Sequence, residues 1–225
     1  MNLRPFYRVA AASLAVQLLL GGWGLARVGA SARVPIHWNA AGEPNGYGPA
    51  WLAFLLLPGV TVCLVGLFAL IPKVEPRRAN LLRSSRAYLT IAYAMLVLML
   101  GLDVATVLAG VGYDVPIASL AGGGVGLLLA TLGNVLTTVR SNFMVGVRTP
   151  WTLTSDLAWD RTHRLIGRLW VVGGVLLFLV SLLGRPEILL AVLLAFIVIT
   201  LVLAFVYSYL VWKTDPDKRS LVGEA

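Results

Sequence analysis

The chain has 225 residues, of which 59% are hydrophobic and only 12% are charged, and its mean hydropathy is +0.86. Soluble domains carry about 25% charged and about 45–50% apolar residues, so the composition excludes an ordinary soluble domain and favours lipid as the main solvent. The formal net charge of +8 is placed in particular loops between apolar runs, and it does not follow one amphipathic stripe. That placement indicates membrane topology and argues against direct nucleic-acid binding.

Six apolar segments are long enough to cross a bilayer. A hydrocarbon core of about 30 Å needs roughly 20 apolar residues in a helix, and no alternating pattern of a β-barrel is present. The fifth segment is short, but Arg168 and Arg185 at its ends can snorkel to the interfaces. The sequence therefore predicts an all-α, polytopic integral membrane protein with six transmembrane helices, at residues 9–26, 51–71, 87–108, 117–138, 169–183 and 188–212.

The basic residues set the expected orientation. If the N-terminus is cytoplasmic, fifteen of the 18 lysines and arginines lie in cytoplasmic segments, and only Arg27, Arg33 and Arg185 lie on the other side. Positively charged loops stay on the cytoplasmic side of the membrane. We therefore predict that both termini are cytoplasmic (N-in/C-in) and that the protein is a multi-pass protein of the bacterial cytoplasmic (inner) membrane.

One alternative concerns the first span. Arg4 and Arg8, an apolar run and then Ala30-Ser31-Ala32 resemble a secretory signal with a small-residue cleavage site. Cleavage would leave the mature N-terminus outside the cell and would change nothing downstream. The sequence leaves both interpretations open.

The outer loop, residues 27–50, contains the stretch PIHWNAAGEPNGY. We expect its turn at Glu43-Pro44-Asn45-Gly46, because proline presets φ and Asn-Gly tolerates the left-handed region. The loop is either an ordered connection with its aromatic side chains at headgroup level or a small recognition surface. The candidate outer binding residues are His37, Trp38, Asn39 and Tyr47.

The inner loop, residues 139–168, is rich in hydrogen-bonding groups. The residue before proline avoids the α region, so Thr149-Pro150 predicts an extended entry to a helix with Thr154 as its N-cap. Asp156, Asp160 and His163 then share one helix face, and Arg164 can pair with Asp160. The simplest interpretation is an interfacial helix that leads into the fifth span. The polar groups also predict a binding surface of Asn142, Arg148, Thr149, Trp151, Trp159, His163 and Arg164.

The sequence lacks patterns for catalysis or metal binding. His37 and His163 fall on opposite sides of the membrane in the predicted topology, and Cys63 is the one cysteine, so a zinc site cannot be assembled. HExxH, GxSxG and P-loop motifs are absent. We therefore expect no enzyme activity, no metal and no cofactor.

Asp103 is the one charged residue within a predicted span. Ionisable groups in a membrane segment are functional candidates by default. Asp103 lies towards the outer end of its span, so we expect a capping role or a pair with Arg27 or Arg33, and not a proton relay.

Two other spans carry single polar residues. Gln17 and Asn134 are expected to form interhelical hydrogen bonds. Gly122, Gly126 and Ala130 recur every four residues, and this spacing predicts close packing of one helix against another.

Three stretches resemble the immunity-protein family of the bacterial sporulation-delaying toxin (SdpI-like). The outer loop is similar to PIHWNxxGxPDGY, the pattern of a recurrent N-terminal domain of unknown function. Pro72-Lys73-Val74-Glu75-Pro76, followed by Asn80, resembles a proline-basic-acidic-proline stretch. The third block, GN…N…GxRTPWTL…W…THR…G, is matched between Gly133 and Gly167. Asn45 stands where aspartate is common, and Gly48-Pro49 replaces a typical Ser-Lys, so the departures concern any outer ligand.

The resemblance implies immunity to a secreted antimicrobial peptide toxin. It also implies signalling, in which the membrane protein sequesters a small winged-helix repressor at the cytoplasmic face. A small-solute or ion transporter or channel, and a structural subunit of a membrane complex, are the alternatives from other classes.

The family pattern and the spans together divide the chain into four parts. Residues 1–71 form a helical hairpin with the outer PIHWN loop, and residues 72–116 form the basic inner loop and third span. Residues 117–212 form the SdpI-like C-terminal region with the inner RTPWTL-THR loop, and residues 213–225 form a cytoplasmic tail.

Overall fold

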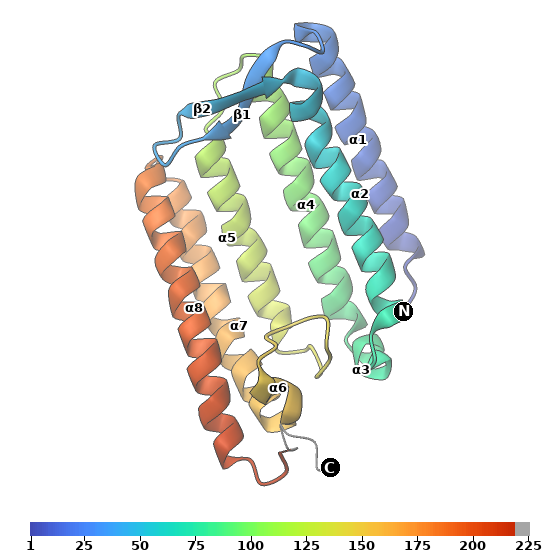
Figure 1. Cartoon of the computed structure of the whole chain (residues 1–225), viewed down its shortest axis with the longest axis vertical. Helices are drawn as coiled ribbons and strands as arrows, with labels where there is room; N and C mark the ends of the chain where they lie inside the picture. The colour runs from blue at the N-terminus through green and yellow to red at the C-terminus, as the bar shows by residue number, and fades with distance from the viewer. Residues whose placement is uncertain (219–225) are drawn as a thin grey trace.

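The computed structural model describes residues 1–218 of the chain (Figure 1). Six of its helices are long and apolar enough to cross a membrane, which confirms the predicted polytopic helical class. They are α1 (Arg4–Val28), α2 (Ala50–Val74), α4 (Ser85–Gly110), α5 (Ile117–Leu136), α7 (Asp156–Ser181) and α8 (Pro186–Thr214). The remaining elements are the short helices α3 (Arg78–Arg83) and α6 (Pro150–Thr154) and the strands β1 (Arg33–Trp38) and β2 (Pro44–Pro49).

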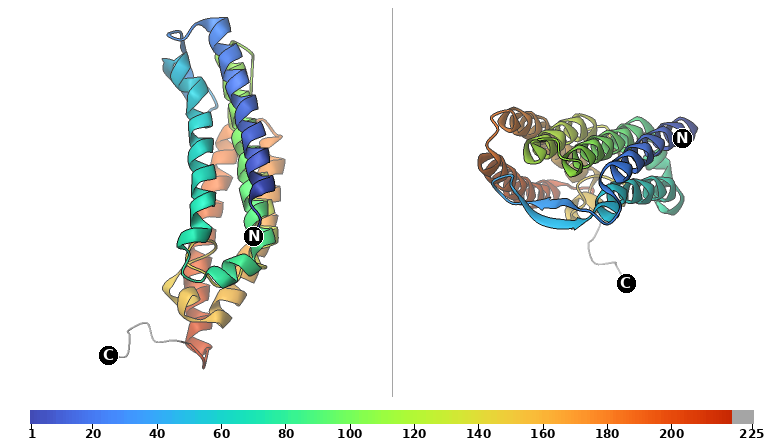
Figure 2. Two further views of the ribbon diagram at one scale, coloured as in Figure 1. Left: turned by 90° about the vertical axis from the view of Figure 1, so that its right-hand side faces the viewer. Right: turned by 90° about the horizontal axis from the view of Figure 1, so that it is seen from above.

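The long helices form two groups of three. Helices α1, α2 and α4 pack on one another, helices α5, α7 and α8 pack on one another, and contacts between α4 and α5 join the groups. The right-hand view of Figure 2, in which the molecule is seen from above, shows the two groups side by side. Helix α1 begins and α8 ends at the same end of the molecule, which we call the loop end because residues 137–149 lie there (Figure 1). The opposite end carries the two strands and is called the hairpin end.

Helix α7 is longer than the predicted fifth span. The predicted interfacial helix and the span are one continuous helix of 26 residues, Asp156–Ser181. The predicted N-cap at Thr154 is wrong: the Ser155 hydroxyl accepts a hydrogen bond from the Ala158 amide, 2.9 Å away. Thr154 instead ends the separate helix α6, whose own N-cap is Thr149. Two helices, α6 and α7, therefore begin within a few residues of each other, where the sequence suggested a single helix start.

Glycines let α5 and α7 approach to backbone contact. A Cβ atom added at Gly174 would lie 2.5 Å from both the Ala130 nitrogen and the Gly126 oxygen, and one added at Gly133 would lie 2.5 Å from the Gly167 oxygen. Lipid tails are as apolar as leucine, so close packing and not hydrophobicity holds such helices together. The predicted close packing at Gly126 and Ala130 is confirmed, whereas Gly122, the third residue of the pattern, packs against Leu189 of α8.

A β-hairpin that the sequence did not predict lies across the hairpin end (Figure 1). Strands β1 and β2 pair antiparallel, and a Cβ atom at Gly42 in their turn would lie 3.1 Å from the Pro186 Cγ atom. The hairpin therefore reaches from α1 and α2, which flank it in sequence, to the start of α8.

The turn of this hairpin is not where the sequence placed it. The Asn39 side-chain oxygen accepts hydrogen bonds from the amides of Ala41 (2.9 Å) and Glu43 (3.0 Å), and Gly42 takes a φ of +80°. Asparagine side chains that bond the backbone ahead of them form turns by themselves. Of the residues predicted to turn, Glu43 lies in the turn, whereas Pro44, Asn45 and Gly46 lie in strand β2.

The glycine contacts predict unequal effects of two matched alanine substitutions. Gly174→Ala should destabilise the protein by about 1–3 kcal/mol, the usual cost of overpacking, because its Cβ atom would meet backbone. Gly66→Ala in α2 has open space around it and should be neutral or stabilising, since alanine is the better helix former. Thermal unfolding of the purified proteins in detergent measures both. Equal melting temperatures would contradict the proposed packing.

Candidate functional site

The loop between α5 and α6, residues 137–149, is folded around one buried asparagine. The Asn142 amide nitrogen donates to the carbonyls of Arg140 and Val145, each at 2.9 Å. Its oxygen accepts from the Met144 amide at 2.9 Å and the Val145 amide at 2.7 Å. A buried side-chain amide that uses both its donors and its acceptor is fully satisfied. Asn142 therefore sets the loop conformation and has no capacity left for a ligand.

His163 and Trp159, on the first turns of α7, hold the other side of the loop. His163 Nδ1 lies 2.8 Å from the Trp159 carbonyl, which can only accept, so Nδ1 carries the proton. His163 Nε2 therefore accepts from the Val147 amide at 3.0 Å. The Trp159 indole nitrogen donates to the Val139 carbonyl at 2.7 Å, and its ring stacks on the imidazole with centroids 4.0 Å apart. Both side chains are buried, and each donates or accepts a hydrogen bond with the loop backbone.

Gly146 makes this arrangement possible. Its φ is +120°, a backbone conformation that L side chains rarely adopt, and a Cβ atom there would lie 2.5 Å from His163 Nε2. Only glycine combines that backbone angle with the close approach to the imidazole ring.

The segment after α2 clamps the loop from the other helix group. The buried Glu75 carboxylate accepts from the Phe143 amide at 3.1 and 3.2 Å, and also from the Arg77 amide at 2.8 Å. The Arg77 guanidinium donates to the Ser141 hydroxyl and, at 2.9 Å, to the Leu153 carbonyl. It also lies over the Phe143 ring, 4.6 Å from the centroid. In the sequence, Glu75 is marked only as part of the family pattern, and no motif singles out Arg77.

Helix α8 holds the end of the loop. The Thr149 hydroxyl donates to the Ser208 hydroxyl at 2.9 Å, and Thr149 forms a capping box with Thr152 at the start of α6. Trp151 packs edge-on against Phe205 and lies beside Tyr209, with ring centroids 4.7 and 5.2 Å away. The loop is therefore fixed by contacts to three different helical segments.

The structure divides the predicted inner binding residues into two kinds. Asn142, Thr149, Trp159 and His163 are buried, and Trp151 is half-buried. Arg148 and Arg164 are exposed, and the Arg148 guanidinium makes one hydrogen bond, to the Phe143 carbonyl at 2.7 Å. Of the predicted set, only these two arginines present their charged groups to an external molecule.

The predicted pair between Arg164 and Asp160 does not form. The Arg164 Nε atom donates to the backbone carbonyl of Asp160, at 3.3 Å, and not to its carboxylate. Within residues 1–218 the one ion pair joins Arg185 to Glu187, at 3.9 Å. Asp160 is exposed whereas His163 is covered by the loop, so these residues do not form a shared polar cluster.

At the hairpin end, two of the four predicted outer residues are available. His37 is exposed, with Nδ1 2.6 Å from the Asn45 side-chain oxygen, and Tyr47 is 49% exposed. Trp38 and Asn39 are half-buried, and the Asn39 side chain is used in the turn. The outer candidate surface therefore reduces to His37 and Tyr47.

The polar residues predicted within the spans have three different outcomes. Gln17 makes the expected interhelical hydrogen bond, from the Thr61 hydroxyl to the Gln17 oxygen at 3.1 Å. Asn134 is exposed on α5. Asp103 is fully buried, and neither of its carboxylate oxygens has a hydrogen-bond partner within residues 1–218. The predicted partners of Asp103 are engaged elsewhere.

Arg27 and Arg33 each have another contact. Arg27 lies over the Trp23 ring, 5.5 Å from its centroid, and Arg33 donates to the Tyr47 carbonyl at 2.8 Å. The predicted pairing of Asp103 with either arginine is therefore wrong.

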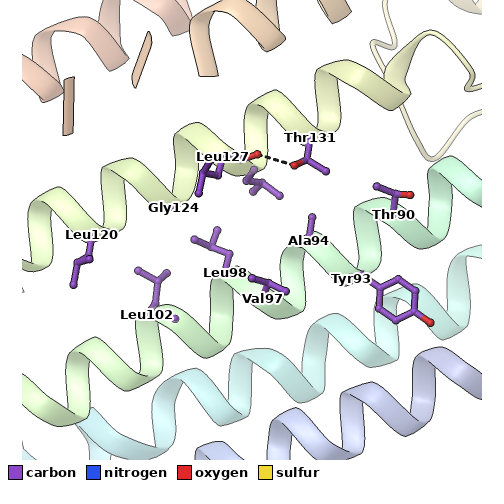
Figure 3. A pocket seen from close by; sticks show the side chains of 12 residues that line it. Thr90, Tyr93, Ala94, Val97, Leu98, Leu102, Leu120, Gly124, Leu127 and Thr131 are labelled. Atoms are coloured by element: carbon purple, nitrogen blue, oxygen red, sulfur yellow. Dashed lines mark hydrogen bonds between the residues drawn. The ribbon is translucent and has the colours of Figure 1, made fainter. Parts of the chain in front are cut away.

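An apolar groove of about 560 Å³ lies between α4 and α5, at the junction of the two helix groups (Figure 3). Leu98, Leu102, Leu120 and Leu127 line it. The hydroxyl of Thr131 at its rim is turned to the carbonyl of Leu127 in its own helix, at 2.8 Å. The groove suits apolar chains and offers no cluster of polar groups for catalysis.

Two parts of the chain match known protein families or domains. Residues 138–210, which hold the loop, α6, α7 and most of α8, match the SdpI/YfhL protein family. Residues 15–62, which hold the hairpin, match a domain of unknown function (DUF1648). The predicted SdpI-like resemblance is confirmed. The chain is also 28% identical to "Immunity protein SdpI" of Bacillus subtilis (strain 168) over 182 residues, 80% of this chain and 84% of that protein. No solved structure matches this chain.

The contact between α7 and the end of α8 predicts a pH dependence. The Ser155 hydroxyl donates to the Asp215 carboxylate, and the Asp217 amide donates to it at 3.0 Å. These hydrogen bonds hold the pKa of Asp215 below its ordinary value. The charged form therefore stabilises the fold at neutral pH, and this contribution is lost as the pH falls through the lowered pKa.

Asp215→Asn should accordingly lower the melting temperature at neutral pH, and its difference from the wild type should shrink in acid. Asp217→Asn keeps its backbone amide and an exposed side chain, so it serves as the matched control. Melting curves of the three proteins across that pH range provide the measurement. A deficit of Asp215→Asn that persists unchanged in acid would contradict the assigned role.

Proposed function

We propose that this chain is a membrane immunity protein that protects a bacterial cell against a secreted antimicrobial peptide toxin. The observation that carries the proposal is the similarity to an immunity protein over 80% of the chain. In addition, residues of the family pattern contact one another at the loop end of the structure. Asn142, Trp159 and His163 hold the loop, while Gly146 leaves room for it.

The orientation proposed for this function puts the hairpin outside and the loop end in the cytoplasm. Exposed basic residues gather at the loop end, among them Lys73, Arg78, Arg83, Arg86, Arg140, Arg148, Arg161, Arg164 and Arg168. Such a surplus is typical of the cytoplasmic side of a membrane protein. In this orientation the membrane is the cytoplasmic membrane of a bacterium.

The hairpin is the proposed contact for the toxin. A peptide that arrives from outside meets this end first, and the hairpin exposes Ile36 and Tyr47 (42% and 49%) beside His37. An exposed apolar and aromatic surface with a hydrogen-bonding group suits an amphipathic peptide, since aromatic anchors carry much of the energy at interfaces. The strand pairing fixes these side chains on one rigid element.

A cytosolic partner would meet the loop end. The proposed partner is a small winged-helix repressor, and Arg148 and Arg164 are the exposed members of the predicted inner surface. Exposed guanidinium groups can form bidentate, charge-assisted hydrogen bonds with carboxylates of such a partner. The two proposed contacts lie at opposite ends of the helices, so they should be separable by mutation.

Toxin challenge tests the proposal. Bacillus subtilis cells that lack their own immunity protein would express this chain and be exposed to the sporulation-delaying toxin, and survival would be measured against toxin concentration. The wild-type chain should protect, and the double variant His37→Ala with Tyr47→Ala should tolerate roughly tenfold less toxin, the usual loss at an interface hot spot. Tyr113→Ala, which removes an aromatic side chain 59% exposed at the same end, should protect like the wild type.

Membrane abundance of each variant provides the control for folding. Arg148→Ala with Arg164→Ala should leave protection intact, because these side chains lie at the other end. Absence of protection by the wild-type chain at normal abundance would overturn the immunity function. Equal protection by all variants would overturn the hairpin as the contact.

A further inference from the structure

Three fully buried polar side chains lie in the α1–α2–α4 group: Gln17, Thr61 and Asp103 are each 0% exposed. Thr61 and Gln17 are hydrogen-bonded to each other across α2 and α1. The height of Asp103 follows from the contact of Gly24 in α1 with Val107 in α4, where an added Cβ atom would lie 3.0 Å from the valine. Counting back along these two helices, which run in the same direction, puts Asp103 within about one helical turn of Gln17 in height along the helix axes.

The backbone of α2 adds a further acceptor near this level. Pro58 lies inside α2 and is buried. Proline has no N–H group, so the carbonyl of Phe54 loses its usual helical donor. That carbonyl faces α1, because a Cβ atom at Gly21 would lie 3.0 Å from its oxygen. Broken hydrogen bonds of this kind leave carbonyl oxygens free to meet a cation in membrane proteins.

Acceptor oxygens outnumber donors in this layer. The Thr61 hydroxyl has one proton for two acceptors, Gln17 Oε1 at 3.1 Å and the Leu57 carbonyl at 2.9 Å. The Gln17 nitrogen makes one long bond to Ser13, at 3.4 Å. The two oxygens of Asp103 have no partner within the described chain.

No positive charge faces Asp103 from the helices packed on it. Residues 9–26 of α1, residues 51–71 of α2 and residues 117–136 of α5 carry no charged side chain. The basic residues beyond them at the hairpin end, Arg27 and Arg33, contact Trp23 and the Tyr47 carbonyl. A lone carboxylate in such surroundings is costly, and membrane proteins neutralise it.

We propose that Asp103 is a proton-binding site, at which the carboxyl group carries a proton and donates it in a hydrogen bond to Gln17 Oε1. A metal cation would need several oxygen ligands and room between the helices, whereas α1 and α2 approach to backbone contact at Gly21 and Phe54. A proton adds no volume and converts one surplus acceptor into a donor. The site is independent of the proposed immunity function, because it lies inside the helix group and not on either surface.

Infrared spectroscopy of the full-length protein in lipid nanodiscs tests this site. A protonated carboxyl group has a C=O stretching band that a carboxylate lacks. We expect the wild type to show this band at neutral pH, Asp103→Asn to lose it, and Asp114→Asn, at an exposed position, to keep it. The band should be unchanged when sodium chloride is replaced by choline chloride.

Three outcomes would overturn the proposal. They are the absence of the band from the wild type at neutral pH, its persistence in Asp103→Asn, and its appearance only after sodium is removed. The last would indicate a sodium site.

Gln17→Leu tests the assigned hydrogen-bond partner. Loss of the acceptor should shift the carboxyl band to higher frequency, and the helical amide band recorded in the same spectrum shows whether the variant is folded. A folded Gln17→Leu protein with an unshifted carboxyl band would contradict the proposed hydrogen bond.

Discussion

The loop end depends on one constraint, which is that backbone groups without helical partners must be paired inside a folded membrane protein. Residues 137–149 form no regular element, and several of their amides donate to side chains, some within the loop and some in other segments. Phe143 donates to Glu75, Met144 and Val145 donate to Asn142, and Val147 donates to His163. The polar residues that make this segment conspicuous in the sequence are those that hold it.

This use of the polar residues decides what remains for binding. Buried polar groups that are hydrogen-bonded to the loop cannot also bind another molecule. Of the predicted inner residues, the exposed arginines Arg148 and Arg164 remain available for binding. The same contacts connect the two helix groups, because Glu75 and Arg77 belong to the first group and the loop to the second. At the opposite end, the approach of Gly42 to Pro186 makes a second connection. Each proposed contact surface thus lies beside a connection between the groups.

The spans were predictable because a long apolar run in a chain of this composition has few alternatives to a membrane helix. The hairpin was not, because two turn signals compete within a few residues: the Asn39 side chain turns the chain, and the stronger-looking Pro-Asn-Gly stretch becomes strand. Helix α3 also escaped prediction, since its six residues are too few to show a pattern.

The sequence shows which residues of the loop carry hydrogen-bonding groups, but not what those groups contact. Hydrogen-bonding residue types marked Asn142 and His163 as candidates, yet burial, which makes them structural, is a property of the tertiary fold. The predicted pairing of Asp103 with an arginine is wrong for a related reason. The position of Asp103 near the outer end of its span suggested an arginine partner. The side chain is instead buried in the α1–α2–α4 group, which also contains Gln17. Sequence spacing gives the face of a helix and not the neighbour it meets.

Hydrogen–deuterium exchange of the peptide that covers residues 141–149 is the most direct test of the loop as a fixed scaffold. The structure predicts exchange about as slow as in the first turns of α7, and much slower than in the exposed turn around Gly112. Asn142→Ala should release this protection while leaving the transmembrane helices protected, because it removes the acceptor of two loop amides. Fast exchange of the loop in the wild type, or unchanged slow exchange in Asn142→Ala, would contradict the account.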